Sequence, residues 1–168
     1  MYYRVTGDST QNRGVQPDVS LPSPISTEEV GESSRDAALP WNRIRPAQFK
    51  RDGTLAPVVS DLQRLHEQRV AADADFQHLI SEVTTLEEMR KRKSVSLNLE
   101  QRRAERKAMS HGELMRENQR RAALGEDVLE DAEDIKDPPD VVLAEAAQIA
   151  ADLVGVEPRH VARNKTGG

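Results

Sequence analysis

The fold class follows from the stretch Asp75-Phe76-Gln77-His78-Leu79-Ile80-Ser81-Glu82-Val83-Thr84-Thr85-Leu86. Its apolar residues recur three, four, seven and ten positions after Phe76, at Leu79, Ile80, Val83 and Leu86. This spacing places them on one face of an α-helix. We expect Asp75 to cap the helix and the cations of Arg90-Lys91-Arg92-Lys93 to end it, at the negative end of the helix dipole. The stretch therefore predicts an amphipathic helix that needs a packing partner.

Helical patterns continue on both sides of this stretch. Before it, a turn at Asp52-Gly53 precedes a helix that we expect Ser60 to cap. The helix has its apolar face at Val58, Val59, Leu62 and Leu65 and continues to Arg69. After it, the residues from Val95-Ser96-Leu97-Asn98-Leu99 to about Leu124 have high helix propensity but few apolar positions. They predict a solvated helix with a break near Ser110-His111-Gly112, because a mid-helix glycine costs about 1 kcal/mol relative to alanine.

The last helical pattern is expected to run from an Asp140 cap to about Val154, with a wide face of small and apolar residues. A strongly acidic segment from Glu126 to Asp137 precedes it and predicts a solvated linker, because like charges repel. At the other end of the chain, Tyr2–Thr6 predicts a short strand, and Val19 with Leu21 predicts a second one. Pro22–Asp36 predicts an extended connector.

We expect the Trp41 ring, after Ala38-Leu39-Pro40, to insert into an apolar pocket as a structural anchor rather than as part of a ligand site. The predicted fold class is therefore mainly α: a short N-terminal β remnant of a larger sheet, followed by a helical domain with extended linkers. Two short strands do not make a stable sheet alone, so we expect them to flank a sheet outside this sequence.

The composition predicts a small core. Of 168 residues, 36% are hydrophobic, 32% are charged and five are aromatic. The net charge of −5 argues against a nucleic-acid binder. The cluster Arg90–Lys93 with Arg102, Arg103, Arg106 and Lys107 is interleaved with glutamates and contains no aromatic residue that could stack on a base. No cysteine is present, which excludes disulfides and thiolate sites. The N-terminus resembles no signal peptide, so we expect any export signal to lie upstream.

The sequence contains no recognisable site for chemistry. His66, His78, His111 and His160 show no metal-ligand spacing, and neighbouring carboxylates such as Glu87 and Glu88 do not face each other on a helix. No glycine-rich loop is placed to cradle a phosphate. No serine lies in a glycine-flanked elbow or a Ser-x-x-Lys pattern. We therefore assign no catalytic, cofactor-binding or metal-binding residue.

Several landmarks resemble the tail-specific protease family, also called carboxy-terminal processing peptidases, from Tyr2 to about Leu153. Tyr2–Gly7 followed by Gly14-Val15-Gln16-Pro17-Asp18 is similar to the end of that family's protease domain. Ala38-Leu39-Pro40-Trp41-Asn42-Arg43-Ile44 and Val95-Ser96-Leu97-Asn98-Leu99 resemble two landmarks of its helical C-terminal region, and Asp140–Leu153 is similar to its final helix. The landmark residues are Gly14, Pro17, Asp18, Pro40, Trp41, Ser96 and Asn98.

The resemblance implies residues 1–24 as the end of a serine protease domain, 25–37 as a connector, 38–155 as the helical domain and 156–168 as a flexible tail. It implies a periplasmic endopeptidase with a PDZ module and a Ser/Lys pair that acts on proteins with apolar C-termini. The catalytic pair lies outside this chain, so we expect the chain alone to be inactive. The implied partners are the rest of the protease, its protein substrates and a membrane-anchored adaptor. The alternatives are a free-standing helical interaction module and, third, a nucleic-acid binder.

Overall fold

A computed structural model describes residues 1–49 and 56–165, with side chains of the final helix described through residue 155. The predicted turn at Asp52-Gly53 lies outside the described residues. The elements in chain order are α1 (Thr27–Val30), the 3-10 turn η1 (Glu32–Ser34), α2 (Ala56–Ala72), α3 (Ala74–Arg90), α4 (Leu99–Leu124), the 3-10 turn η2 (Ala132–Asp134) and α5 (Val141–Lys165). The mainly helical fold class is confirmed.

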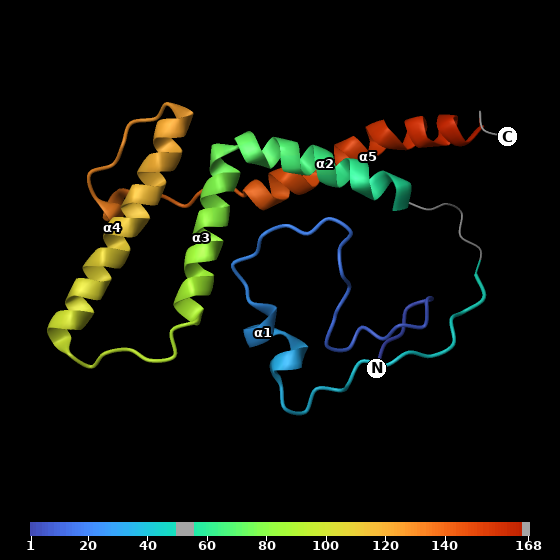
Figure 1. The fold of residues 1–168 in the computed structure, drawn as a ribbon, viewed down its shortest axis with the longest axis horizontal. Coiled ribbons are helices and arrows are strands. Elements are labelled where there is room, and N and C mark those ends of the chain that lie inside the picture. The colour runs from blue at the N-terminus through green and yellow to red at the C-terminus, as the bar shows by residue number, and fades with distance from the viewer. Residues whose placement is uncertain (50–55, 166–168) are drawn as a thin grey trace.

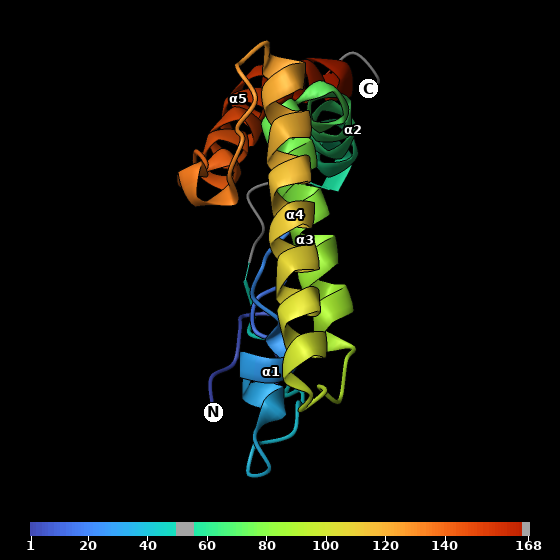
Figure 2. The same cartoon turned by 90° about the vertical axis from the view of Figure 1, so that its left-hand side faces the viewer.

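The four long helices form two antiparallel pairs. Helix α2 packs against α5, and α3 packs against α4. The chain turns sharply between α2 and α3, so the α3/α4 pair projects away from the α2/α5 pair (Figure 1). Seen from the side, α3 and α4 lie next to each other along their length (Figure 2). The loop that joins α3 to α4 is therefore far from the α2/α5 pair.

The core is small and lies mainly along α2 and at the α2/α3 corner. Val58 and Leu62 are buried against Leu65, Ile149 and Leu153. Val70 and Val83 are also buried, and Phe76 at the corner is only 2% exposed. The face predicted for residues 76–86 is thus a packing face, anchored by Phe76 and Val83.

Two predicted caps are wrong and one is confirmed. Asp73, not Asp75, caps α3, because its carboxylate accepts a hydrogen bond from the Phe76 amide at 2.9 Å. Ser60 does not cap α2, which already begins at Ala56. Proline fits the first turn of a helix, so Pro57 favours this earlier start. Asp140 caps α5 as predicted, accepting from the Leu143 amide at 2.9 Å.

The predicted break near Gly112 is also wrong, because α4 is continuous from Leu99 to Leu124. A Cβ at Gly112 would meet only the tip of the Arg116 side chain, at 3.3 Å. The glycine therefore costs helix propensity without disturbing packing. At the C-terminal end, α5 continues to Lys165, well beyond the predicted end at Val154, so most of the tail expected to be flexible is helical. Residues 166–168 lie outside the described residues.

The two predicted N-terminal strands do not form. Residues 5–9 pair with 42–47 through single hydrogen bonds and one isolated bridge, Asp8 with Arg43. A second isolated bridge, Tyr3 with Ser9, lies within the N-terminal segment. Gly7 turns the chain here with φ +86°, and a Cβ on it would lie 2.2 Å from the Ile44 carbonyl oxygen. Within the described residues, neither Tyr2–Thr6 nor the segment of Val19 and Leu21 lies beside a strand with which it could form a β-ladder. Val19 instead packs on the Val58–Leu62 core.

The connector predicted to be extended contains α1 and η1. It is held to the end of α3 by Arg90, which donates to the Pro24 carbonyl and pairs with Glu29 at 3.3 Å. The acidic linker is held to α4 in a similar way. Asn118 accepts from the Leu129 amide at 2.7 Å and donates to its carbonyl at 2.9 Å. Both segments are therefore attached to the helices at particular residues, while most of their residues are exposed.

Candidate functional site

The seven landmark residues lie in three separate places. Pro17 and Asp18 lead into the segment of Val19 and Leu21, which lies along a groove between α2 and α5. Gly14 turns the chain just before them with φ +60°. The landmarks Ser96 and Asn98 shape the α3–α4 connection. Ser96 Oγ accepts from the Asn98 amide at 3.2 Å, and the Asn98 side chain caps α4 by accepting from the Gln101 amide at 3.0 Å.

The third place is the segment of Pro40 and Trp41, beside the N-terminal turn. Trp41, predicted to insert into an apolar pocket as an anchor, is half-buried. Its ring is covered by the Arg13 guanidinium, 4.3 Å from the ring centroid. This cation–π contact ties residues 11–14 to the segment that follows Pro40. Trp41 is therefore an anchor for the N-terminal segment rather than for the helical core.

The strongest polar cluster joins α2 to α5, and we call it the α2–α5 network. It consists of His66 and Arg69 on α2 and of Glu145 and Asp152 on α5. Glu145 is 7% exposed, and its Oε1 accepts from His66 Nδ1 at 2.8 Å and from Arg69 Nη2 at 2.6 Å. Arg69 also donates from Nε to Glu145 Oε2 at 3.1 Å and from Nη1 to Asp152 at 2.6 Å. One arginine thus binds two carboxylates of the facing helix.

Ionisation of Glu145 is set by two opposed effects. Burial raises the pKa of Glu145, but the hydrogen bonds from Arg69 and His66 outweigh burial and hold that pKa below its ordinary value. The same carboxylates raise the pKa of Arg69, so its guanidinium stays charged. Because an ionised carboxylate only accepts hydrogen bonds, His66 carries its proton on Nδ1. The other side of the His66 ring meets Phe76 edge-on, with centroids 5.6 Å apart.

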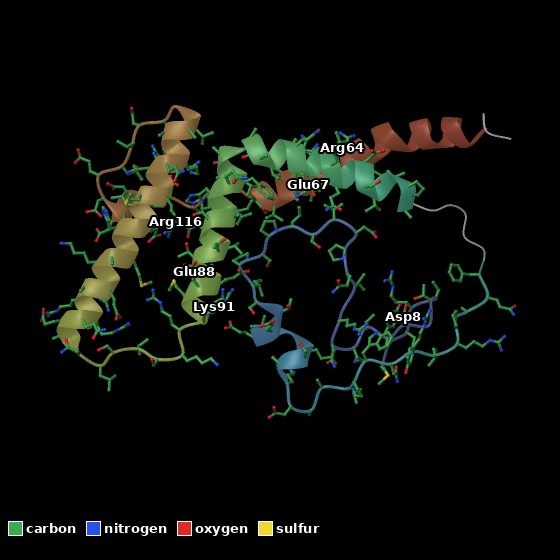
Figure 3. The ribbon with its side chains drawn as sticks, viewed as in Figure 1. Asp8, Arg64, Glu67, Glu88, Lys91 and Arg116 are labelled. Carbon is green, nitrogen blue, oxygen red and sulfur yellow. The ribbon has the colours of Figure 1, made fainter. Side chains whose placement is uncertain are left out.

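A second cluster joins α3 to α4, and we call it the α3–α4 network. It consists of Asp75 and His78 on α3 and of Glu117 and Arg120 on α4. Arg120 donates to both oxygens of Glu117, at 2.7 and 2.8 Å, and to Asp75 at 2.6 Å. His78 Nε2 lies 4.0 Å from Glu117, which is 5% exposed. Farther along the same pair, Arg116 bridges to Glu82 (Arg116 is labelled in Figure 3).

In the α3–α4 network, as in the α2–α5 network, burial and hydrogen bonding have opposed effects on the pKa of a glutamate. The hydrogen bonds from Arg120 lower the pKa of Glu117 against the effect of burial, and His78 and Arg121 add to the lowering. The pKa of Arg120 is raised by Glu117 and Asp75. The buried Nδ1 of His78 has no hydrogen-bond partner among the described residues. Ion pairs from Arg120 to Asp75 and from Arg116 to Glu82 thus join α4 to α3, which helps to explain how a helix with few apolar residues is held in place.

Sequence reasoning did not find these clusters, because their partners are far apart in the chain. Glu145 is 79 residues from His66. A weaker signal was present at short range. His66 and Arg69, and likewise Glu117 and Arg120, stand three residues apart and so share one helix face. Polar pairs on a face that otherwise packs indicate buried interhelical ion pairs.

The geometry of both clusters suits helix-to-helix attachment. Among the residues that the structure describes, no three His, Asp or Glu side chains converge as a metal site would require. None of the helices in the described ranges combines the length and apolar content needed to cross a membrane. The fold and the two networks define a mainly helical region in which partly buried ion pairs join the facing helices.

Comparison with known proteins identifies the family. Residues 25–155 match the family described as the C-terminal domain of tail specific protease. The chain therefore belongs to the tail-specific protease family, as its landmarks indicated. It is 36% identical over 159 residues to a protein named tail-specific protease from Haemophilus influenzae. That match covers 91% of this chain but 23% of the relative, so the chain spans about a quarter of the relative's length.

Proposed function

We propose that this chain is the scaffolding and docking region of a periplasmic tail-specific serine endopeptidase. In this proposal residues 1–24 belong to the end of the protease domain, 25–37 connect, and 38–155 form the helical domain. The Ser/Lys pair and the PDZ module lie in the part of the protease outside this chain. The whole enzyme cleaves proteins that it selects through apolar C-termini, and a membrane-anchored adaptor binds the assembled protease.

The observation that carries the proposal is the family match over residues 25–155, combined with helix pairs joined by partly buried ion pairs, Arg69 with Glu145 between α2 and α5 and Arg120 with Asp75 between α3 and α4. Removing one partner of a buried pair costs about 3–5 kcal/mol, so such pairs hold facing helices in one arrangement. A fixed arrangement of helices suits a region that positions other parts of an enzyme.

A chimera tests the proposal. The Haemophilus influenzae relative would be prepared intact, without its matching region, and with this chain in place of that region. We expect the truncated form to lose cleavage of a protein substrate with an apolar C-terminus and the chimera to recover it. The isolated chain should cleave nothing. Equal cleavage by the truncated form and the chimera would show that the region is dispensable, and would favour the free-standing interaction module.

Location is tested separately, by fractionating the source cells and probing each fraction with an antibody raised against this chain and with the cleavage assay. We expect the protein in the periplasmic fraction with its activity intact. Protein and activity that appear only in the cytoplasmic fraction would contradict the periplasmic assignment.

A further inference from the structure

The loop that joins α3 to α4 exposes apolar side chains to an unusual degree. We call residues 90–99 the hairpin tip. Leu97 is 96% exposed, Val95 is 65% exposed and Leu99 is 61% exposed. Val95 and Leu97 lie in the loop itself, and Leu99 is the first residue of α4. The tip thus offers three exposed apolar side chains, which we call the apolar row. The loop that carries them lies at the end of the α3/α4 pair that is far from the α2/α5 pair (Figure 1).

The hairpin tip is held in shape without these apolar side chains. At one end, the Lys91 and Arg92 amides donate to carbonyls of the last turn of α3. At the other, Ser96 accepts from the Asn98 amide, and Asn98 caps α4. The loop is ordered by polar contacts, so its apolar residues are not needed to fold it. Binding through such a preorganised loop costs little conformational entropy.

The positive charge of the hairpin tip indicates which kind of partner surface can bind it. Arg90 is occupied by Glu29 and the Pro24 carbonyl. Lys91, Arg92 and Lys93 are exposed and form no ion pair within the described part of the chain (Lys91 is labelled at the end of α3 in Figure 3). Three unpaired cations beside an apolar row match a surface that combines an apolar pocket with carboxylates at its rim.

We propose that the hairpin tip docks into an apolar, acid-rimmed pocket on the part of the protease outside this chain. The inference rests on the proposed function and names the contact that the helical region makes. The relative is about four times longer than the matched segment, so most of its surface is available to supply the pocket. Leu97 is the central anchor, since central, fully buried apolar side chains dominate binding energy at interfaces.

Thiol labelling tests the contact, because the chain has no cysteine of its own. The variants Leu97→Cys and, as a control, Leu143→Cys would be made in the isolated chain and in the chimera, whose other cysteines are replaced by serine. Leu143 is 66% exposed on the first turn of α5. We expect maleimide to label residue 97 at least tenfold more slowly in the chimera than in the isolated chain, and to label residue 143 at similar rates in both.

A charge variant adds a second readout. Reversing Lys91, Arg92 and Lys93 to glutamate should return labelling at residue 97 of the chimera to the fast rate of the isolated chain. The matched reversal of Arg4, Arg35 and Arg45, which are also exposed, should leave the protection unchanged. If residue 97 of the chimera is still labelled slowly after Lys91, Arg92 and Lys93 are reversed, the proposal that carboxylates rim the pocket is overturned.

The outcomes separate the two proposals. An active chimera with fast labelling at residue 97 overturns the docking contact and leaves the proposed function standing. A folded but inactive chimera with fast labelling at residue 97 overturns both. If residue 97 of the isolated chain is protected by phosphatidylglycerol vesicles but not in the chimera, the tip binds a lipid surface, and the protease contact is refuted.

Discussion

Replacing Arg69 by methionine should destabilise the chain more than any comparable change on the outer face of α2. Methionine keeps much of the side-chain volume but leaves Glu145, 7% exposed, with His66 as its remaining partner. Removing one partner of a buried ion pair costs about 3–5 kcal/mol. Arg69 itself is 31% exposed, so water screens part of this loss, and we expect about 3 kcal/mol. For a chain of this length that corresponds to a fall in Tm of roughly 6–12 °C.

The matched control is Arg64→Met on the same helix. The Arg64 side chain is 56% exposed, and its contacts with Asp61 at 3.6 Å and Gln68 at 3.4 Å are long and lie within the same helix. Its loss should therefore cost less than about 0.5 kcal/mol (Arg64 is labelled in Figure 3). Urea unfolding followed by circular dichroism at 222 nm measures both variants. Equal midpoints for the two would refute the claim that the α2–α5 network holds the helices together.

The same network predicts how stability depends on pH. The pKa of Glu145 is lower in the folded chain than in the unfolded one, so its contribution is complete above the ordinary glutamate value of about 4.3. The contribution is lost as the pH falls through the folded value. In Arg69→Met, burial raises the pKa of Glu145 with less opposition. The variant should therefore lose less unfolding free energy between about pH 5 and about pH 3 than the parent chain does. An identical loss would contradict the assignment.

Three further changes test the helices and the linker. Gly112→Ala should raise stability by about 0.5–1 kcal/mol in urea unfolding, because the new methyl group meets only the flexible end of Arg116; a loss would mean that the helix is broken there after all. Asp73→Ala should cost about 1 kcal/mol through loss of the α3 cap, and an unchanged midpoint would restore the original assignment of the cap. Asn118→Ala should free the backbone of Leu129 and speed proteolysis within residues 126–137, as read by mass spectrometry; unchanged cleavage would refute the tether.

The sequence predicted the features that depend on local periodicity and capping, namely the position of α3 and the start of α5. The apolar spacing from Phe76 to Leu86 located α3, and Asp140 located the start of α5, because both signals act within one or two turns. Asp75 was a plausible cap by the same local rule. Asp73 takes that role because its carboxylate reaches the Phe76 amide, whereas Asp75 is bound by Arg120.

Contacts between residues that are far apart in the sequence were not predicted. The attachment of α4 depends on pairs such as Arg120 with Asp75, 45 residues apart, which no periodicity reveals. The N-terminal strands were predicted from β-branched and aromatic residues, but a strand also needs an adjacent strand. Gly112 remains helical because propensity is a weak preference that the continuing helix and its ion pairs override.

The most direct test of the central claim is an immunoblot of fractionated source cells with an antibody raised against this chain. The account predicts a periplasmic band several times heavier than the 18.7 kDa of the chain, as expected for a region that spans about a quarter of its relative. A cytoplasmic band near 18.7 kDa would contradict it.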